Sequence, residues 1–252
     1  MNGPGFCFIH GYSGHPDNWE ELRAALPGVT GALIPTLAGH GEAAGASGPF
    51  QIERCAEDIL AALPGKQVLV GHSMGTRIAM QIAACAPECV QAMILIDGSN
   101  APGDSGLLTQ TRTDENKAGN HDAVMDDILT SMMVEGLPGT TTSRMMNRVH
   151  ALSNEAALEY EISMMDWDSD RFPPILQDIS CPVLVLQSTS LVVGQGWARK
   201  SIDEQPGSLW LDAWEASGKS EIARIGGAGH YVMMEKPDLV AEHIQSFLNG
   251  LS

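Results

Sequence analysis

The sequence predicts an α/β protein in which a doubly wound, mostly parallel sheet is interrupted by a helical insertion. Short apolar runs alternate with helical patterns in the first half of the chain, as a parallel sheet with crossover helices requires. No strand-like run occurs between about residues 99 and 178. The strand signal then returns at 182–186 and again at 221–225.

Six short apolar runs predict the strands of this sheet. In chain order they span residues 6–9, 31–34, 68–70, 92–96, 182–186 and 221–225. The clearest helical patterns cover about 52–63, before Pro64-Gly65, and about 237–248. A further helix is expected to begin near residue 18, with Asp17 as its N-cap and Glu20 as the capping-box partner. We therefore expect about six strands.

Length and composition suit one globular domain with an insertion. The chain has 252 residues, of which 44% are hydrophobic and 18% are charged. We expect residues 1–98 and 179–252 to form the core that contains the sheet, and residues 99–178 to form the insertion. Asp166, Asp168 and Asp170 are expected to form a solvated turn around one anchoring aromatic residue, Trp167.

The charge balance limits the partners that the protein can bind. The sequence has 14 Lys and Arg against 31 Asp and Glu, a formal net charge of −17. Such an acidic chain disfavours nucleic acid, because basic side chains must neutralise the phosphates. A small neutral or apolar substrate fits better. No run approaches the roughly 18 apolar residues of a membrane span, so no membrane partner is expected; nothing indicates an oligomeric state.

The cysteines and the first residues indicate a cytoplasmic protein. The cysteine number is odd, and these residues lie within apolar runs, which favours free thiols in a reducing compartment: Cys7, Cys55, Cys85, Cys89 and Cys181. The opening Met-Asn-Gly-Pro-Gly lacks the features of a signal peptide. No His or Cys pair complements Cys85 and Cys89 as metal ligands, so no metal or organic cofactor is expected.

The strongest motif surrounds Ser73. Residues 71–75 have the sequence Gly-His-Ser-Met-Gly and lie between the predicted strand 68–70 and an apolar helix, which is the context of a nucleophile elbow. A serine on such a tight turn projects its hydroxyl into a cleft, and the flanking glycines remove side chains that would collide. The N-terminus of the helix supplies backbone N–H groups that stabilise an oxyanion. This pattern predicts Ser73 as a nucleophile.

Over nearly its whole length the chain resembles the α/β-hydrolase family. Residues 8–14, Phe-Ile-His-Gly-Tyr-Ser-Gly, look like the oxyanion loop of that family. The resemblance implies an oxyanion hole made by the backbone N–H groups of Tyr12 and Met74. It also implies that the insertion at 99–178 is a cap over the cleft, where its many methionines would adapt to a ligand. By the same resemblance, we expect the family's usual first two strands to be absent.

The resemblance also implies a histidine base and an acid. His230, after the last predicted strand, occupies the position of the family's catalytic histidine. In most relatives an aspartate follows the penultimate strand, but residues 187–193 contain no carboxylate. A minority of the family takes the acid from the strand after the nucleophile helix, where this chain has Asp97. The order Ser73, Asp97, His230 suits the family, while Asp203, Asp212 or a bare Ser–His pair are the alternatives.

These residues together predict a serine hydrolase that cleaves a small carboxylic ester through a Ser73–His230–Asp97 triad and an acyl-enzyme. Three alternatives share the fold. The same triad could hydrolyse a lactone or a carbon–carbon bond beside a ketone. The His230–Asp97 pair could serve a cofactor-free oxygenase, or the fold could be a non-catalytic ligand sensor or carrier. Trp197, beyond the loop that lacks an acid, is a candidate pocket residue.

Overall fold

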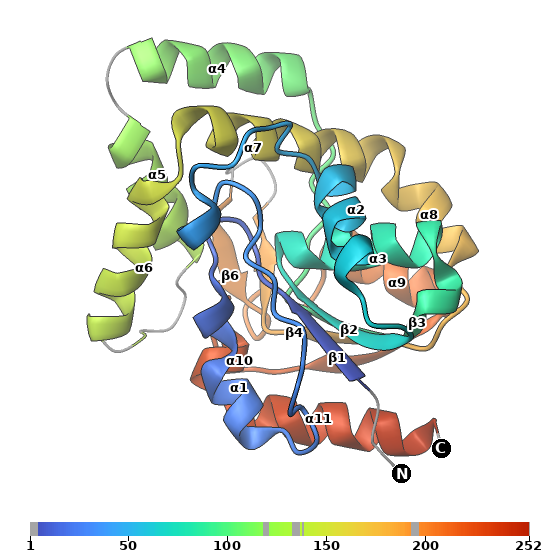
Figure 1. Cartoon of the computed structure of the whole chain (residues 1–252). Helices are drawn as coiled ribbons and strands as arrows, with labels where there is room; N and C mark the ends of the chain where they lie inside the picture. Colours follow the sequence, from blue (N-terminus) through green and yellow to red (C-terminus); the bar gives the residue numbers. More distant parts are fainter. Residues whose placement is uncertain (1–4, 118–120, 133–136, 138, 193–196, 252) are drawn as a thin grey trace.

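The computed structural model describes residues 5–117, 121–132, 137, 139–192 and 197–251. Its centre is a parallel sheet of five strands in the order β1-β2-β3-β4-β7 (Figure 1). The strands are β1 (Gly5–Ile9), β2 (Gln67–His72), β3 (Val90–Ile96), β4 (Val183–Gln187) and β7 (Ser220–Arg224). All six residues of β2 are buried, because helices cover both faces of a parallel sheet. The predicted α/β class is confirmed.

The strand count differs from the expected six. In the predicted strand 31–34, Leu33 alone pairs with the sheet: it bridges to Cys7, and its N–H and carbonyl bond to Phe6 and Phe8 at 2.9 Å. Pro35 has no N–H with which to extend this pairing. A separate antiparallel pair, β5 (Thr189–Leu191) and β6 (Arg199–Ser201), was not predicted, because its strands are short and polar.

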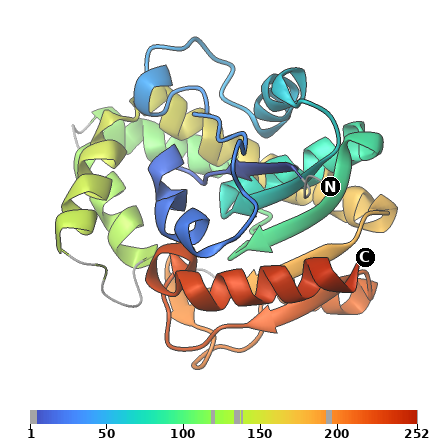
Figure 2. The ribbon, with the colours of Figure 1, turned by 60° about the horizontal axis from the view of Figure 1, so that its bottom comes forward.

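Two groups of helices cover the sheet. On one side α1 (Glu20–Ala25) packs against α11 (Pro237–Gly250), which runs along the sheet in Figure 2. The buried residues of α11 recur at helical spacing: Val240, Ala241, Ile244 and Phe247. The other group contains α2 (Ile52–Ala62), α3 (Met74–Cys85) and α9 (Leu209–Ser217). Helix α3 contacts β1, β2 and β3, so it lies over the centre of the sheet.

Short helical turns complete the core. They are η1 (Pro16–Trp19), η2 (Gly41–Ala43), η3 (Pro87–Cys89) and α10 (Val232–Glu235). The expected capping by Asp17 is wrong: His15 is the N-cap of η1, with Asn18 as its capping-box partner. Proline is favoured just inside a helix start, so Pro16 moves the cap back to residue 15. Asp17 instead pairs with Arg148.

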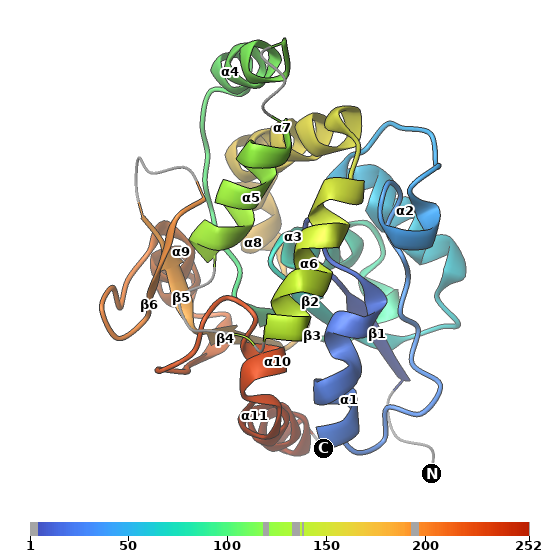
Figure 3. The same ribbon diagram turned by 90° about the vertical axis from the view of Figure 1, so that its left-hand side faces the viewer.

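In the described part of the segment between β3 and β4, the chain forms five helices. They are α4 (Ser105–Lys117), α5 (His121–Met132), α6 (Gly139–Ala151), α7 (Asn154–Asp170) and α8 (Phe172–Asp178). Figure 3 shows α5 and α6 side by side, with α7 crossing above them, and α7 also contacts α2 and α3. Four methionines of this segment are buried in the core, namely Met125, Met132, Met145 and Met164. Met133 lies outside the described residues.

The solvated turn expected at 166–170 is wrong. These residues form the last turns of α7, and Asp168 is buried. Its carboxylate receives two hydrogen bonds from buried Arg77 on α3, at 2.8 and 2.6 Å, and one from the N–H of Ala101 at 2.7 Å. In the sequence alone, this run of aspartates around a tryptophan resembles a solvated turn, because the cationic partner of Asp168 cannot be recognised there. That partner is 91 residues away.

No described helix is long and apolar enough to cross a membrane. Within the same described residues, no group of three or more His, Cys, Asp or Glu side chains is placed to hold a metal ion.

A close approach of backbones joins β1 to the start of α3. A Cβ atom on Gly75 would lie 2.2 Å from the carbonyl oxygen of Ile9, and one on Gly71 would lie 2.4 Å from the carbonyl oxygen of Gly75. Backbone atoms cannot move aside as the end of a flexible side chain can. Glycine is therefore required at both positions by packing.

Four histidines are buried near the carboxyl ends of the strands: His10, His40, His72 and His230. Removal from water disfavours the imidazolium form. Burial lowers the pKa of His40 and of His230 to about 4. Burial, with nearby histidine charge, holds the pKa of His10 and of His72 well below the ordinary value. The folded protein therefore keeps these four side chains neutral in mildly acid solution.

We predict that Gly75→Ala destabilises the fold by roughly 3 kcal/mol or more, because the added methyl group overpacks a rigid backbone contact. Gly45→Ala is the matched control, since nothing lies within 4 Å of a Cβ atom placed there. Urea unfolding of both variants measures the difference. Equal stability of the two variants would contradict the close approach of Ile9 and Gly75.

A second prediction concerns acid. In the unfolded chain these four histidines bind protons near pH 6.5, whereas in the folded chain His40 and His230 do so only near pH 4. Stability that is present above pH 6.5 is therefore lost as the pH falls through this window, because the unfolded chain gains protons that the folded chain does not. Urea midpoints at constant moderate salt measure the slope. An unchanged midpoint from pH 7 to 5 would contradict the assignment.

Candidate active site

Ser73 occupies the sharp turn between β2 and α3. Its backbone has φ 53° and ψ −117°, a conformation that non-glycine residues rarely adopt. The N–H of Ser73 donates to the carbonyl of Ile96 at 3.0 Å, and the Thr76 hydroxyl donates to the carbonyl of Ser73 at 2.7 Å. Within residues 67–80, all of them described, every residue except Ser73 is buried. The turn thus presents one polar side chain from an otherwise buried segment.

The loop at residues 10–14 lies against this turn. A Cβ atom on Gly11 would be 2.9 Å from the Cβ atom of Ser73. Tyr12 is the next residue, and Met74 opens α3, where backbone N–H groups have no partner within the helix. Of the two residues that the sequence predicts for an oxyanion hole, Met74 therefore follows Ser73 directly in the chain. Tyr12 follows Gly11, which lies against Ser73.

Two of the buried histidines hold that loop. The ring of His10 accepts the Leu37 N–H at Nε2 (3.2 Å), so its Nδ1 carries the proton and donates to the carbonyl of Gly11 (2.9 Å). His40 accepts the Ser13 N–H at Nε2 (3.0 Å) and donates from Nδ1 to the carbonyl of Ala38 (3.0 Å). An imidazolium has no acceptor and would lose one bond in each case. Both histidines are structural and neutral.

The side chain of Tyr12 connects this loop to the helices between β3 and β4. Its hydroxyl donates to Oε1 of buried Glu161 on α7 at 3.1 Å. The other oxygen of Glu161 accepts from Nε of Arg112 on α4 at 2.8 Å. Burial and the Glu161 charge raise the pKa of Tyr12 well above its usual value, so the phenol keeps its proton. The loop beside Ser73 and two insertion helices thus share one hydrogen-bonded network.

Asp97 and His230 are brought together at the carboxyl edge of the sheet. Asp97 directly follows β3, has φ 46° and is fully buried. Its Oδ2 atom lies 2.6 Å from Nδ1 of His230. His230 lies in the loop after β7, and its carbonyl accepts from Nε2 of His72 at 2.8 Å. His230 is thus held both by its side chain and by its backbone.

Neither alternative acid contacts His230. Oδ2 of Asp203 accepts the N–H of Gly227 at 2.8 Å, three residues before the histidine. Asp212 lies in the first turn of α9 and lines a separate pocket. Among the three carboxylates considered from the sequence, the structure brings Asp97 alone to the His230 side chain.

Every lone pair of the Asp97 carboxylate is engaged. Oδ1 accepts the N–H groups of Ser188 and Thr189, each at 2.8 Å, and the Ser188 hydroxyl at 3.0 Å. Oδ2 accepts the Thr189 hydroxyl at 2.5 Å and Nη1 of Arg199 at 3.2 Å, besides His230. Burial opposes ionisation, but the His230 and Thr189 bonds and the Arg199 charge outweigh it, so the pKa of Asp97 lies well below its usual range.

These partners were missed by sequence reasoning for different reasons. Ser188 and Thr189 belong to residues 187–193, the segment that lacks a carboxylate, and their hydroxyls donate to a carboxylate that follows the neighbouring strand. Hydroxyl residues in place of an acid were a usable signal in the sequence that the carboxylate comes from elsewhere. Arg199, on β6, had no signal at all, because nothing in its local sequence points toward Asp97, 102 residues earlier.

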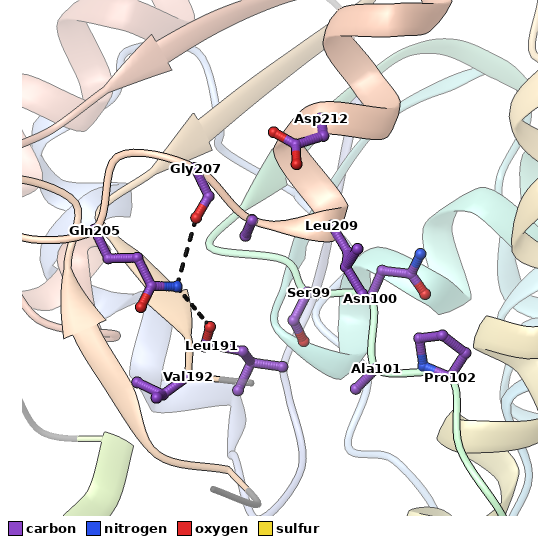
Figure 4. Close-up of a pocket in the computed structure, with 11 residues that line it drawn as sticks. Ser99, Asn100, Ala101, Pro102, Leu191, Val192, Gln205, Gly207, Leu209 and Asp212 are labelled. Atoms are coloured by element: carbon purple, nitrogen blue, oxygen red, sulfur yellow. Dashed lines mark hydrogen bonds between the residues drawn. The ribbon is translucent and has the colours of Figure 1, made fainter. Parts of the chain in front are cut away.

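A pocket of about 330 Å³ opens beside the segment that follows Asp97 (Figure 4). Residues 99–102 form one wall, Leu191 and Val192 a second, and the start of α9 a third. Gln205 fixes this geometry by donating to the carbonyl of Leu191 at 2.8 Å. The pocket does not include Ser73 or His230. Trp197 is partly buried against the hydrophobic core and is not among the residues that line the pocket.

Comparison with known proteins identifies the fold. The chain is 27% identical over 267 residues to a protein of Haemophilus influenzae named "Putative esterase/lipase", covering 99% of this chain and 84% of that protein. An esterase from Thermogutta terrifontis superposes with a TM-score of 0.75 at 20% identity, covering 99% of this chain and 90% of the other. An esterase from Exiguobacterium antarcticum gives 0.77 at 14% identity, covering 98% and 92%. At such low identities the two solved structures show the fold alone.

A family model described as the alpha/beta hydrolase family matches residues 8–243. This match includes the loop beside Ser73, the Ser73 turn itself, and β3 with Asp97 directly after it. It also includes the His230 loop. The chain belongs to the alpha/beta hydrolase family.

Proposed function

We propose that this protein is a serine esterase that hydrolyses a small carboxylic ester, with Ser73 as nucleophile, His230 as base and Asp97 as acid. The observation that supports it most is the 2.6 Å contact between Nδ1 of His230 and Oδ2 of Asp97, at the sheet edge where the Ser73 turn also lies. The bond to Asp97 places the ring proton on Nδ1. Nε2 is left with the lone pair that a general base needs.

The proposed acylation begins when Oγ of Ser73 attacks the ester carbonyl carbon while Nε2 of His230 takes the hydroxyl proton. The carbonyl oxygen becomes an oxyanion, to which the backbone N–H groups of Tyr12 and Met74 donate. The bond to the leaving oxygen then breaks. His230 gives its proton to that oxygen, an alcohol departs, and Ser73 carries the acyl group.

Water then repeats the sequence on the acyl-enzyme. His230 takes a proton from water, the resulting hydroxide adds to the acyl carbon, and the bond to Oγ of Ser73 breaks. The proton returns to Ser73, and a carboxylic acid is released. Asp97 stays ionised throughout, since its oxygens are saturated with donors, and it orients the imidazole at each step.

We further propose that residues 99–178 act as the cap of this site, on a core formed by 1–98 and 179–252. Support comes from the network in which Tyr12 bonds to Glu161 on α7 and Glu161 bonds to Arg112 on α4. Any displacement of these helices would disturb the residue whose N–H faces the oxyanion.

Ser73→Ala is expected to abolish ester hydrolysis, with a loss on the order of 10⁶ in kcat, while the fold is retained. The measurement is turnover of a panel of short-chain esters by the purified variant, with circular dichroism as the check on folding. Wild-type protein should also be labelled at Ser73 by a fluorophosphonate.

The other reactions possible on this fold give different results in the same assay. Lactone or carbon–carbon hydrolysis would label Ser73 but leave the ester panel uncleaved. A cofactor-free oxygenase would consume oxygen and survive Ser73→Ala, and a carrier would bind without turnover. Each of these outcomes would overturn the esterase proposal.

Asp97→Asn is expected to lower kcat by roughly 10³–10⁴ with little change in KM, because the amide favours the wrong tautomer of His230. The matched variants Asp203→Asn and Asp212→Asn change the same functional group at carboxylates that do not contact His230 and should be nearly silent. If Asp97→Asn kept close to full activity while either of the others lost it, the acid would be misassigned.

A further inference from the structure

Arg199 lies directly against the proposed catalytic pair. It belongs to β6, and its side chain is 1% exposed. Nη1 donates to Oδ2 of Asp97 at 3.2 Å and to the hydroxyl of Thr189 at 3.0 Å. Oδ2 is the same oxygen that lies 2.6 Å from Nδ1 of His230. One carboxylate oxygen therefore connects the base to a permanent cation.

The chemistry of the two partners of Asp97 differs. A guanidinium keeps its charge at every pH at which proteins fold, whereas an imidazole gains charge only on protonation. With Arg199 in place, the negative charge of Asp97 is already balanced. A proton added to His230 then places two cations on one buried oxygen, far from water that could screen them.

The geometry of the Arg199 pair differs from that of a purely structural ion pair. Arg77 and Asp168 form a buried two-point contact, Nε to Oδ1 and Nη2 to Oδ2, at 2.8 and 2.6 Å. Arg199 instead uses one nitrogen for both of its bonds, and its buried Nε has no partner among the residues that the structure describes. A buried ion pair is in itself weak evidence that the pair stabilises the fold. The Arg199 pair also lacks the two-point contact that would make it strongest.

We propose that Arg199 is a positioning residue that acts through Asp97: it keeps Asp97 ionised and disfavours protonation of His230, so that the base stays active in mildly acid solution. This inference rests on the proposed esterase function. In agreement with it, burial first and the Arg199 charge second lower the pKa of His230 to about 4, against the raising effect of Asp97.

The other groups around His230 do not supply this effect. His72, at the end of β2, lies with its ring centre 4.6 Å away, but burial keeps it neutral, since its pKa is well below the ordinary value. Tyr231 is a phenol whose ring centre is 5.3 Å away, and burial raises its pKa.

The charged side chains that contact the histidine loop bond to backbone atoms preceding His230. Glu235 on α10 accepts the Gly229 N–H, Asp203 accepts the Gly227 N–H, and Lys236 donates to the Gly226 carbonyl. Arg199 is therefore the cation that contacts the carboxylate partner of the histidine.

The test compares Arg199→Gln, which removes the charge, with Arg199→Lys, which retains it. Arg224→Gln is the control for loss of an arginine, because Arg224 pairs with Glu215 on the protein surface. We measure kcat/KM from about pH 4.5 to 8.5, with circular dichroism at each pH. Arg199→Gln should move the midpoint of the acid limb up by about one pH unit or more, a tenfold change in the ratio of neutral to protonated imidazole. The loss should fall on kcat rather than KM, and Arg199→Lys should keep the wild-type limb.

A second measurement does not depend on turnover. The NMR titration of the His230 ring, identified by the signal that His230→Gln removes, is followed in a Ser73→Ala background with and without Arg199→Gln. Protonation should occur below about pH 5 with Arg199 and at least about one unit higher without it. A titration within about 0.3 unit in the two proteins, or a His230 midpoint near 6.5 with Arg199 intact, would overturn the proposal.

The two proposals fail separately. If Ser73→Ala left ester turnover intact, the esterase function would be wrong, yet the NMR titration would still measure the influence of Arg199 on His230. If Arg199→Gln did not fold, two measurements would still test the role of Arg199. They are the NMR titration midpoint of His230 with Arg199 intact and the acid limb of the Arg199→Lys activity profile. If the midpoint of the acid limb rose by about one pH unit or more in Arg199→Lys, which keeps the charge, a role for the cation would be contradicted.

Discussion

A carboxylate at the end of a central strand must find donors for all its lone pairs when no water reaches it, and Asp97 is such a group. Two backbone N–H groups, two hydroxyls, a guanidinium and an imidazole surround it. Meeting that demand fixes the turn after β4, the register of β5 against β6 and the position of the His230 loop. An unsatisfied buried charge would cost several kcal/mol, so these parts of the site cannot shift independently.

Strain is concentrated at the same edge of the sheet. Ser73 and Asp97 follow the adjacent parallel strands β2 and β3, and both have positive φ. Residues held in such conformations cost about 1–3 kcal/mol each and persist only where their surroundings over-determine them. At Ser73 the surroundings are the backbone contact of Gly75 with Ile9 and the bond to Ile96; at Asp97 they are the carboxylate's six donors. The site is pre-organised by the core rather than by flexible loops.

The sequence predicted those parts whose signal is local. The apolar runs of β2 and β3 and the glycines around Ser73 placed the turn, and the missing acid in residues 187–193 directed attention to Asp97. The failures involve partners distant in sequence: Asp168 resembled a turn residue because Arg77 is far away, and Arg199 gave no signal for Asp97. Proline explains two smaller differences, since Pro16 shifts a helix cap and Pro35 stops a strand. Two side chains that pair across 90 or more residues produce no periodic pattern in the amino-acid sequence.

The central claim is that Asp97 fixes His230 as a neutral base with a free Nε2, and the tautomer of that ring tests it most directly. Nitrogen-15 NMR of histidine-labelled protein at neutral pH distinguishes Nδ1–H, Nε2–H and the cation. The account predicts a proton on Nδ1 and none on Nε2, because Nδ1 donates to a carboxylate 2.6 Å away. A His230 ring protonated on Nε2, or on both nitrogens, at neutral pH would contradict it.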